Sequence, residues 1–195
     1  MLCSLLLLML LFSTACSPVT LPPKHYYNLE ANLGQAKQNT ASQLVILVTP
    51  TGAEAPYRSN KMAYSKSESP YQISYFAENY WASPPARLIS PNVTRAMNAS
   101  GYFKAVANPP YGGMATYRLD TDLLTLRQQF NGNTSSVTLS LQAVLVNAES
   151  NQVLRSRLFT VTQAAVANNP EAGAIAANQA LSNVMQQLQS WVIGK

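Results

Sequence analysis

Residues 71–106 constrain the fold most strongly, because they predict a strand, a helix and a second strand in direct succession. Tyr71, Ile73 and Tyr75 recur at every second position. A period of two is typical of a β-strand, in which successive side chains point to opposite faces. This strand leads into the dipeptide Tyr80-Trp81, just before the point where the helix is expected to begin.

The helix of this unit is marked at both ends. Ser83-Pro84 predicts its start, since a serine can accept the free N–H groups of the first turn and a proline there loses no needed donor. Gly101 predicts its end, because glycine adopts a left-handed conformation at little cost. Pro91 removes one backbone hydrogen bond inside the helix, so we expect a kink or a break there. Residues 102–107 are predicted to form the second strand.

Two strands are predicted before this unit. Residues 44–48 are all apolar, which is typical of a strand covered on both faces and therefore central in its sheet. Residues 60–66 predict a short strand. We expect it to pair with residues 71–79 across a turn at 67–70, which contains serine and proline.

The second half of the chain predicts an antiparallel meander. Residues 116–130 form a long strand whose apolar phase switches at Leu123-Leu124, and such a switch suggests a β-bulge. The turn signal Asn131-Gly132-Asn133 leads into a strand over 136–146, and residues 152–163 return as a third strand. The apolar residues expected to face inward from the middle strand are Val137, Leu139, Leu141, Ala143 and Leu145.

A second helix closes the chain. Asn169-Pro170 predicts its start by the same capping logic. One apolar stripe with spacings of three and four follows, formed by Ala174, Ala177, Leu181, Val184, Leu188 and Trp191. The predicted fold is α+β: an antiparallel-rich sheet with two helices packed on one face.

The N-terminus predicts export and lipidation. Residues 2–12 form an apolar run too short to span a bilayer, and small residues then precede Cys16. We expect residues 1–15 to be a signal peptide and Cys16 to be acylated; a buried N-terminal helix is the alternative. Residues 16–43 would form the lipidated cysteine and an N-terminal tether or first segment, with the extended tether reaching to Lys24, and residues 44–195 the α+β domain. Cys16 would be the one mature cysteine, since Cys3 leaves with the signal.

Several short motifs resemble those of a known family. Tyr80-Trp81-Ala82-Ser83-Pro84-Pro85 and, after the helix, Ser100-Gly101-Tyr102-Phe103 resemble the signature of the ABC-type transport auxiliary lipoproteins, which include the lipoprotein of the Pqi intermembrane transport system. Tyr27-x-Leu29 and Trp191 fit the opening and the end of that pattern. Ser83 departs from it, since the family often has an acidic residue there. The resemblance implies an α+β fold, MCE-type or Pqi-like partners and phospholipid-like cargo.

Composition argues against catalysis and against nucleic acid. The chain has one histidine, His25, and its one mature cysteine would be acylated, so few nucleophile–base pairs are possible. Asp120 and Asp122 share a strand face with Arg118, which favours a solvated charged edge over a metal site. The net charge is +5, but the basic residues are scattered and form no run. We therefore expect no enzyme, no metal or cofactor and no nucleic-acid partner.

Tyrosines provide the candidate binding residues. Aromatic side chains with a polar tip suit protein interfaces, and many of the ten tyrosines occur in one half of the chain. We predict partner contacts at Tyr80, Trp81 and Tyr111; the alternative is that these are ordinary core and sheet-edge aromatics, above all Trp81.

The predicted function is that of a docking lipoprotein. The chain would be held in the outer membrane through Cys16, because Ser17 and not an aspartate follows, with its domain in the periplasm. It would serve an MCE/ABC-type lipid transport system. A periplasmic lipid carrier and a lipoprotein of envelope assembly or cell-wall control remain the alternatives, and self-association into a homo-oligomer is compatible with all three.

Overall fold

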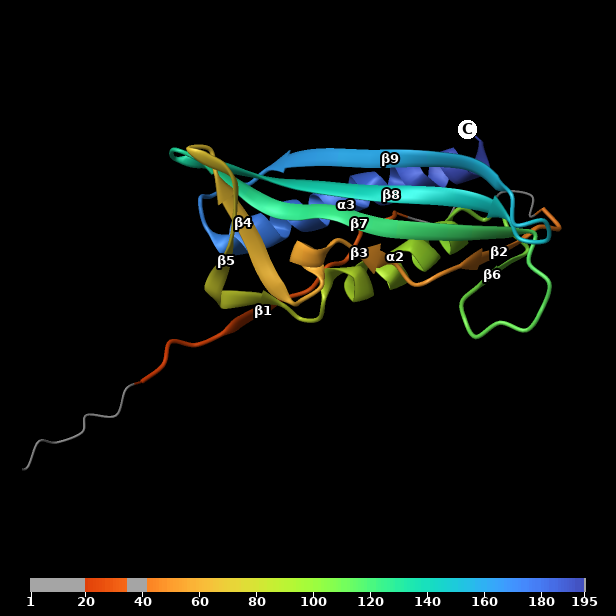
Figure 1. The fold of residues 1–195 in the computed structure, drawn as a ribbon, viewed down its shortest axis with the longest axis horizontal. Helices are drawn as coiled ribbons and strands as arrows, with labels where there is room; N and C mark the ends of the chain where they lie inside the picture. The colour runs from red at the N-terminus through yellow and green to blue at the C-terminus, as the bar shows by residue number, and fades with distance from the viewer. Residues whose placement is uncertain (1–19, 35–41, 195) are drawn as a thin grey trace, which may run out of the picture.

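The computed structural model describes residues 20–34 and 42–194, which form a mixed sheet with two helices (Figure 1). The α+β class predicted from the sequence is confirmed. The predicted signal peptide and Cys16 lie outside the described residues.

The predicted antiparallel meander is present. It consists of β7 (Tyr117–Asn131), β8 (Thr134–Asn147) and β9 (Val153–Ala164). The register between β7 and β8 shifts between Leu123 and Thr125, which confirms the predicted bulge. Gly132 turns the first hairpin with φ of 55°. The inward residues of β8 are all buried, as the alternation predicted.

Short strands extend the sheet along the other edge of β7, and here the pairing is parallel. β2 (Val45–Val48), β3 (Gly52–Ala53) and β4 (Lys61–Lys66) pair with successive parts of β7, and β2 also pairs in parallel with β6 (Ala105–Ala107). The sheet is therefore mixed, with its longest ladders antiparallel. β2 lies between two neighbours as predicted, although its alternate residues are only partly buried.

A hairpin at one end of the sheet receives the N-terminal strand. β4 pairs with β5 (Ser69–Trp81) in antiparallel fashion, as predicted. β1 (His25–Tyr27) adds to β5 in parallel. The path through the sheet is β1-β5-β4-β7-β2-β6, and a short 3-10 helix, η2 (Ala55–Tyr57), lies before β4.

The first helix, α2 (Pro85–Ala99), differs from the prediction at its start. Its N-cap is Pro84, which is extended (φ −48°, ψ 132°) and has no side-chain cap, so the predicted cap at Ser83 is wrong. A residue followed by proline is held out of helical geometry, and the pair Pro84-Pro85 therefore delays the helix. The helix continues through the exposed Pro91, so the possible break there does not occur, and Gly101 follows its end with φ of 60°.

The second helix, α3 (Pro170–Ile193), begins as predicted: the Asn169 side chain accepts from the Ala172 N–H at 2.8 Å. It packs on β8 and β9, while α2 packs on β6 and β7 and against α3. The predicted stripe is buried except for Trp191, which is half-buried. Both helices therefore cover the apolar face of the sheet.

Candidate docking surfaces

The side chains of Tyr80 and Trp81, at the end of β5, lie on opposite faces of the sheet. In the β1–β5 ladder Tyr26 lies opposite Tyr80 and Tyr27 opposite Trp81. Because side chains alternate along a strand, the two pairs point in opposite directions. Trp81 is 3% exposed and belongs to the core, whereas Tyr26 is 60% exposed and Tyr80 is half-buried. The sheet thus assigns the neighbouring residues Tyr80 and Trp81 different environments.

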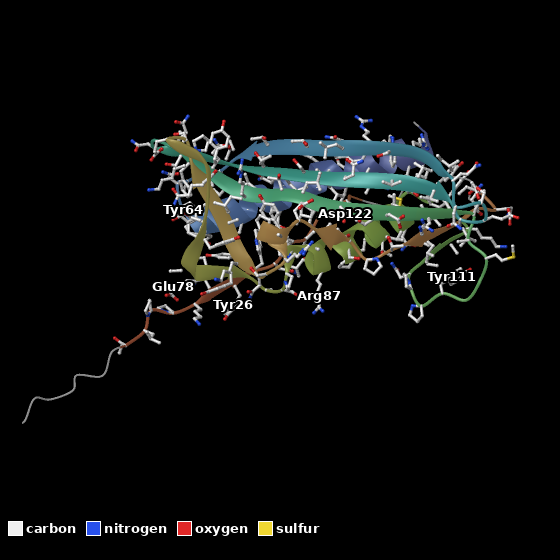
Figure 2. All side chains as sticks on the ribbon, in the orientation of Figure 1. Tyr26, Tyr64, Glu78, Arg87, Tyr111 and Asp122 are labelled. Carbon is white, nitrogen blue, oxygen red and sulfur yellow. The ribbon has the colours of Figure 1, made fainter. Side chains whose placement is uncertain are left out.

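Tyr80 belongs to a line of aromatic and basic side chains. Its ring stacks on that of Tyr26 with centroids 5.7 Å apart, and Lys24 Nζ lies 5.8 Å from the Tyr80 centroid. Lys61 is opposite Tyr80 on β4, and its Nζ lies 5.7 Å from the centroid of Tyr75. We call Lys24, Tyr26, Tyr80, Lys61 and Tyr75 the tyrosine row (Figure 2 labels Tyr26).

The segment after β1 is fixed between the helices. Residues 28–32, which we call the strap, run extended along α2 and α3. On the α3 side, Asn178 Nδ2 donates to the Asn28 carbonyl (3.2 Å), Asn178 Oδ1 accepts from the Glu30 N–H (2.6 Å) and Ser182 Oγ accepts from the Asn32 N–H (2.9 Å). Every second strap residue is thus bonded to α3.

The intervening strap residues are bonded to α2. Asn92 Oδ1 accepts from the Ala31 N–H (2.8 Å), and Asn92 Nδ2 donates to the Leu29 carbonyl (3.1 Å). The Leu29 and Ala31 side chains and Asn92 itself are buried. Side chains of two helices therefore satisfy the strap backbone in place of a neighbouring strand. This arrangement is not predictable from the sequence, because an asparagine inside a helical pattern does not reveal a distant backbone partner.

A groove of about 870 Å³ lies beside the strap between α2 and α3. Amide, carboxylate and guanidinium groups line it together with Leu33 and Ile175, and Arg95 pairs with Glu30 at 3.0 Å within it. Burial, and secondarily the Glu171 charge, raises the pKa of the Tyr27 phenol at its edge. The groove is open and polar side chains form part of its lining, so it differs from the apolar cavity that the lipid-carrier alternative requires.

The third predicted residue, Tyr111, lies in the loop between β6 and β7, at the opposite end of the long axis from Tyr26 (Figure 2). The loop is fixed at both ends, since Asn108 Nδ2 donates to the Val48 carbonyl (3.1 Å) and the Thr116 N–H donates to the Val45 carbonyl (2.8 Å). Between these ends Tyr111 is 41% and Met114 87% exposed. The fold does not bring Tyr111 together with Tyr80 and Trp81.

The charged residues expected at a solvated edge lie instead on β7, which has paired strands on both sides. Arg118 Nε lies 3.0 Å from Asp120 Oδ2, and Thr49 Oγ1 donates to Asp120 Oδ1 at 2.8 Å. Within residues 20–34 and 42–194, no group of three or more histidines, cysteines and carboxylates is arranged to hold a metal ion. In that same part of the chain, no helix combines the length and the apolar character needed to cross a membrane.

Comparison with known proteins identifies related sequences and folds. A family model described as the ABC-type transport auxiliary lipoprotein component matches residues 27–189. A Xanthomonas campestris protein of the family model DUF330 is 24% identical, with 88% of this chain and 94% of that chain covered and a TM-score of 0.73. A second, uncharacterised protein is 16% identical, with 88% and 99% covered and a TM-score of 0.69. These two likenesses concern the fold alone, and no curated protein matches the sequence.

Proposed function

This chain belongs to the family of ABC-type transport auxiliary lipoproteins, and we propose that it is the non-catalytic docking component of an intermembrane lipid transport system. The family describes an envelope lipoprotein associated with an ABC transport system. In our proposal the partner is an MCE-type or Pqi-like protein, the cargo is phospholipid-like, and acylated Cys16 holds the chain in the outer membrane.

The observation on which the proposal rests is the placement of the exposed loop around Tyr111. Lys24 is the eighth residue after Cys16, and an extended chain of that length reaches at most about 26 Å. The β1 end of the domain would therefore stay close to the membrane. The loop between β6 and β7 lies at the other end of the long axis, so it can reach furthest from the membrane towards a partner (Figure 1).

The loop has the chemistry of a docking site. Binding energy at interfaces is concentrated in a few large side chains, tyrosine among them, and methionine adapts to irregular partner surfaces. Tyr111 and Met114 are both exposed, and the fixed ends of the loop lower the entropy lost on binding. Of the three residues predicted from the sequence, Tyr111 is therefore our candidate for the partner contact.

Co-purification tests this assignment. We expect the detergent-solubilised lipoprotein to retain an MCE-type or ABC transport protein, identified by mass spectrometry. Tyr111→Ala should reduce the retained partner by about tenfold or more, as for an interface hot spot, with an unchanged unfolding midpoint.

Tyr71→Ala is the matched control, because Tyr71 is a 98% exposed tyrosine on β5. It should retain the partner as the unsubstituted protein does. Normal retention by Tyr111→Ala would reject the loop as the docking site, and the absence of any transport protein from all samples would reject the proposed function.

A further inference from the structure

The tyrosine row is built by strand register. Lys61 on β4 and Tyr26 on β1 both lie opposite Tyr80 on the intervening strand β5. Side chains that are directly opposite on neighbouring strands share a face of the sheet. Three strands therefore place Lys61, Tyr80 and Tyr26 side by side, facing away from Trp81 and the core.

The rings of the row are oriented by their own hydrogen bonds. The Tyr80 hydroxyl donates to the Ala77 carbonyl at 2.6 Å, and the Tyr75 hydroxyl donates to the Pro56 carbonyl at 3.1 Å. Lys24 Nζ lies over the Tyr80 ring and Lys61 Nζ lies over the Tyr75 ring, so each ammonium group is held at an aromatic face as in a cation–π contact. Tyrosine and lysine side chains both suit membrane interfaces, where tyrosine rings lie at headgroup level and lysine ammonium groups stay in the polar layer beside phosphate.

The charges of the row favour an anionic surface. The two ion pairs in the described part of the chain are Arg95–Glu30 and Arg118–Asp120, so neither Lys24 nor Lys61 is paired within it. Glu78 lies two residues before Tyr80 on the same face and offsets one of the two positive charges. The remaining attraction is modest and depends on both lysines.

The position of the tyrosine row favours a membrane as its partner. Lys24 is the first residue of the row, and in the sequence it comes only eight residues after Cys16. Leu21 in this short segment is exposed as well. An acylated Cys16 would hold the row within about 26 Å of a bilayer. That bilayer would be the nearest large surface that the anchored domain can contact.

We propose that the tyrosine row lies against the anionic phospholipid surface of the anchoring membrane and sets the orientation of the domain on it. This inference rests on the membrane anchor of the proposed function. It assigns Tyr80 to the membrane and leaves Tyr111 to the protein partner.

Footprinting on vesicles tests the contact. Residues 16–195 contain one cysteine, so Cys16 can be coupled to a maleimide lipid in vesicles of phosphatidylethanolamine and phosphatidylglycerol. Acylation of lysines by a water-soluble ester is then read by mass spectrometry. Lys24 and Lys61 should react about fivefold more slowly on these vesicles than in detergent, whereas the exposed Lys66 and Lys104 should react equally in both.

A charge variant tests the cause. Lys24→Gln/Lys61→Gln should abolish the protection of Tyr26 against hydroxyl-radical oxidation on the same vesicles. Lys66→Gln/Lys104→Gln removes the same charge elsewhere and should leave Tyr26 protected.

Two results would overturn the inference. Equal labelling of Lys24 and Lys61 on vesicles and in detergent would mean that the row does not touch the bilayer. Protection that also occurs in detergent and rises with protein concentration would mean that a second copy of the chain covers it. The chemical anchor replaces cellular acylation, so an unmodified Cys16 in cells would reject the anchor without changing this measurement.

Discussion

Neighbouring residues have opposite roles in this protein. Tyr80 and Trp81 form one dipeptide, but strand alternation places the tyrosine in the tyrosine row and the tryptophan in the core. Trp191 is only partly buried. Its ring packs edge-to-face on Phe159 with centroids 5.7 Å apart, and the guanidinium of Arg155 lies over it. The two tryptophans should therefore contribute differently to stability.

We expect Trp81→Ala to lower the free energy of unfolding by about 3–5 kcal/mol, because it empties a fully enclosed site. Trp191→Ala should cost about 2 kcal/mol, since Trp191 is only partly buried and Arg155 keeps its bond to the Val192 carbonyl. Urea unfolding of both variants measures the difference. Equal costs would contradict the burial of the two rings.

At the scale of elements, the strap is the unusual feature. An extended segment is normally paired with another strand, but here side chains of α2 and α3 supply its partners on alternate residues. The strap therefore joins the N-terminal segment to both helices, and displacing it would expose Leu29 and Ala31.

Asn92 is the buried side chain that bonds the strap to α2. Asn92→Ala leaves the buried Ala31 N–H and Leu29 carbonyl without this partner, which should cost about 2–4 kcal/mol in unfolding free energy. Amide exchange of Ala31 should accelerate at the same time. Asn98→Ala, at an exposed position of the same helix, should change stability by less than about 0.5 kcal/mol. A similar loss in both variants would show that the helix and not the strap is affected.

For the whole molecule, the long axis separates the two proposed contacts. Tyr26 of the tyrosine row lies at the end that carries β1, and Tyr111 lies at the other end (Figures 1 and 2). A domain of this shape would hold a transport partner away from the membrane that anchors it.

The anchor itself gives the prediction at this scale. Two buried acyl chains already hold a protein stably on a membrane, so a fully acylated Cys16 should make the chain permanently membrane-bound. We expect Cys16→Ser to move the protein into the soluble fraction of lysed cells, measured by ultracentrifugation and immunoblotting. A Cys16→Ser protein that still sediments entirely with membranes would contradict the anchor.

Features that depend on a few adjacent residues could be predicted from the sequence. The bulge near Leu123, the hairpin turn at Gly132 and the cap at Asn169 follow from local backbone geometry and from hydrogen bonds within a few residues. The cap predicted at Ser83 is wrong for an equally local reason, because Pro85 holds Pro84 out of helical geometry and the helix therefore begins one residue later.

The tertiary structure alone decided what is distant in the chain. Parallel pairing of β2, β3 and β4 with β7, insertion of the strap between the helices and alignment of Lys61, Tyr80 and Tyr26 each join segments that no short-range pattern connects. Their registers are set by burying the apolar face of the whole sheet, because a shift of one residue would turn every side chain of a strand to the wrong face. The sequence therefore predicted the long elements and the family, while packing of the complete domain decided that Trp81 is enclosed, Tyr80 half-buried and Tyr111 remote from both.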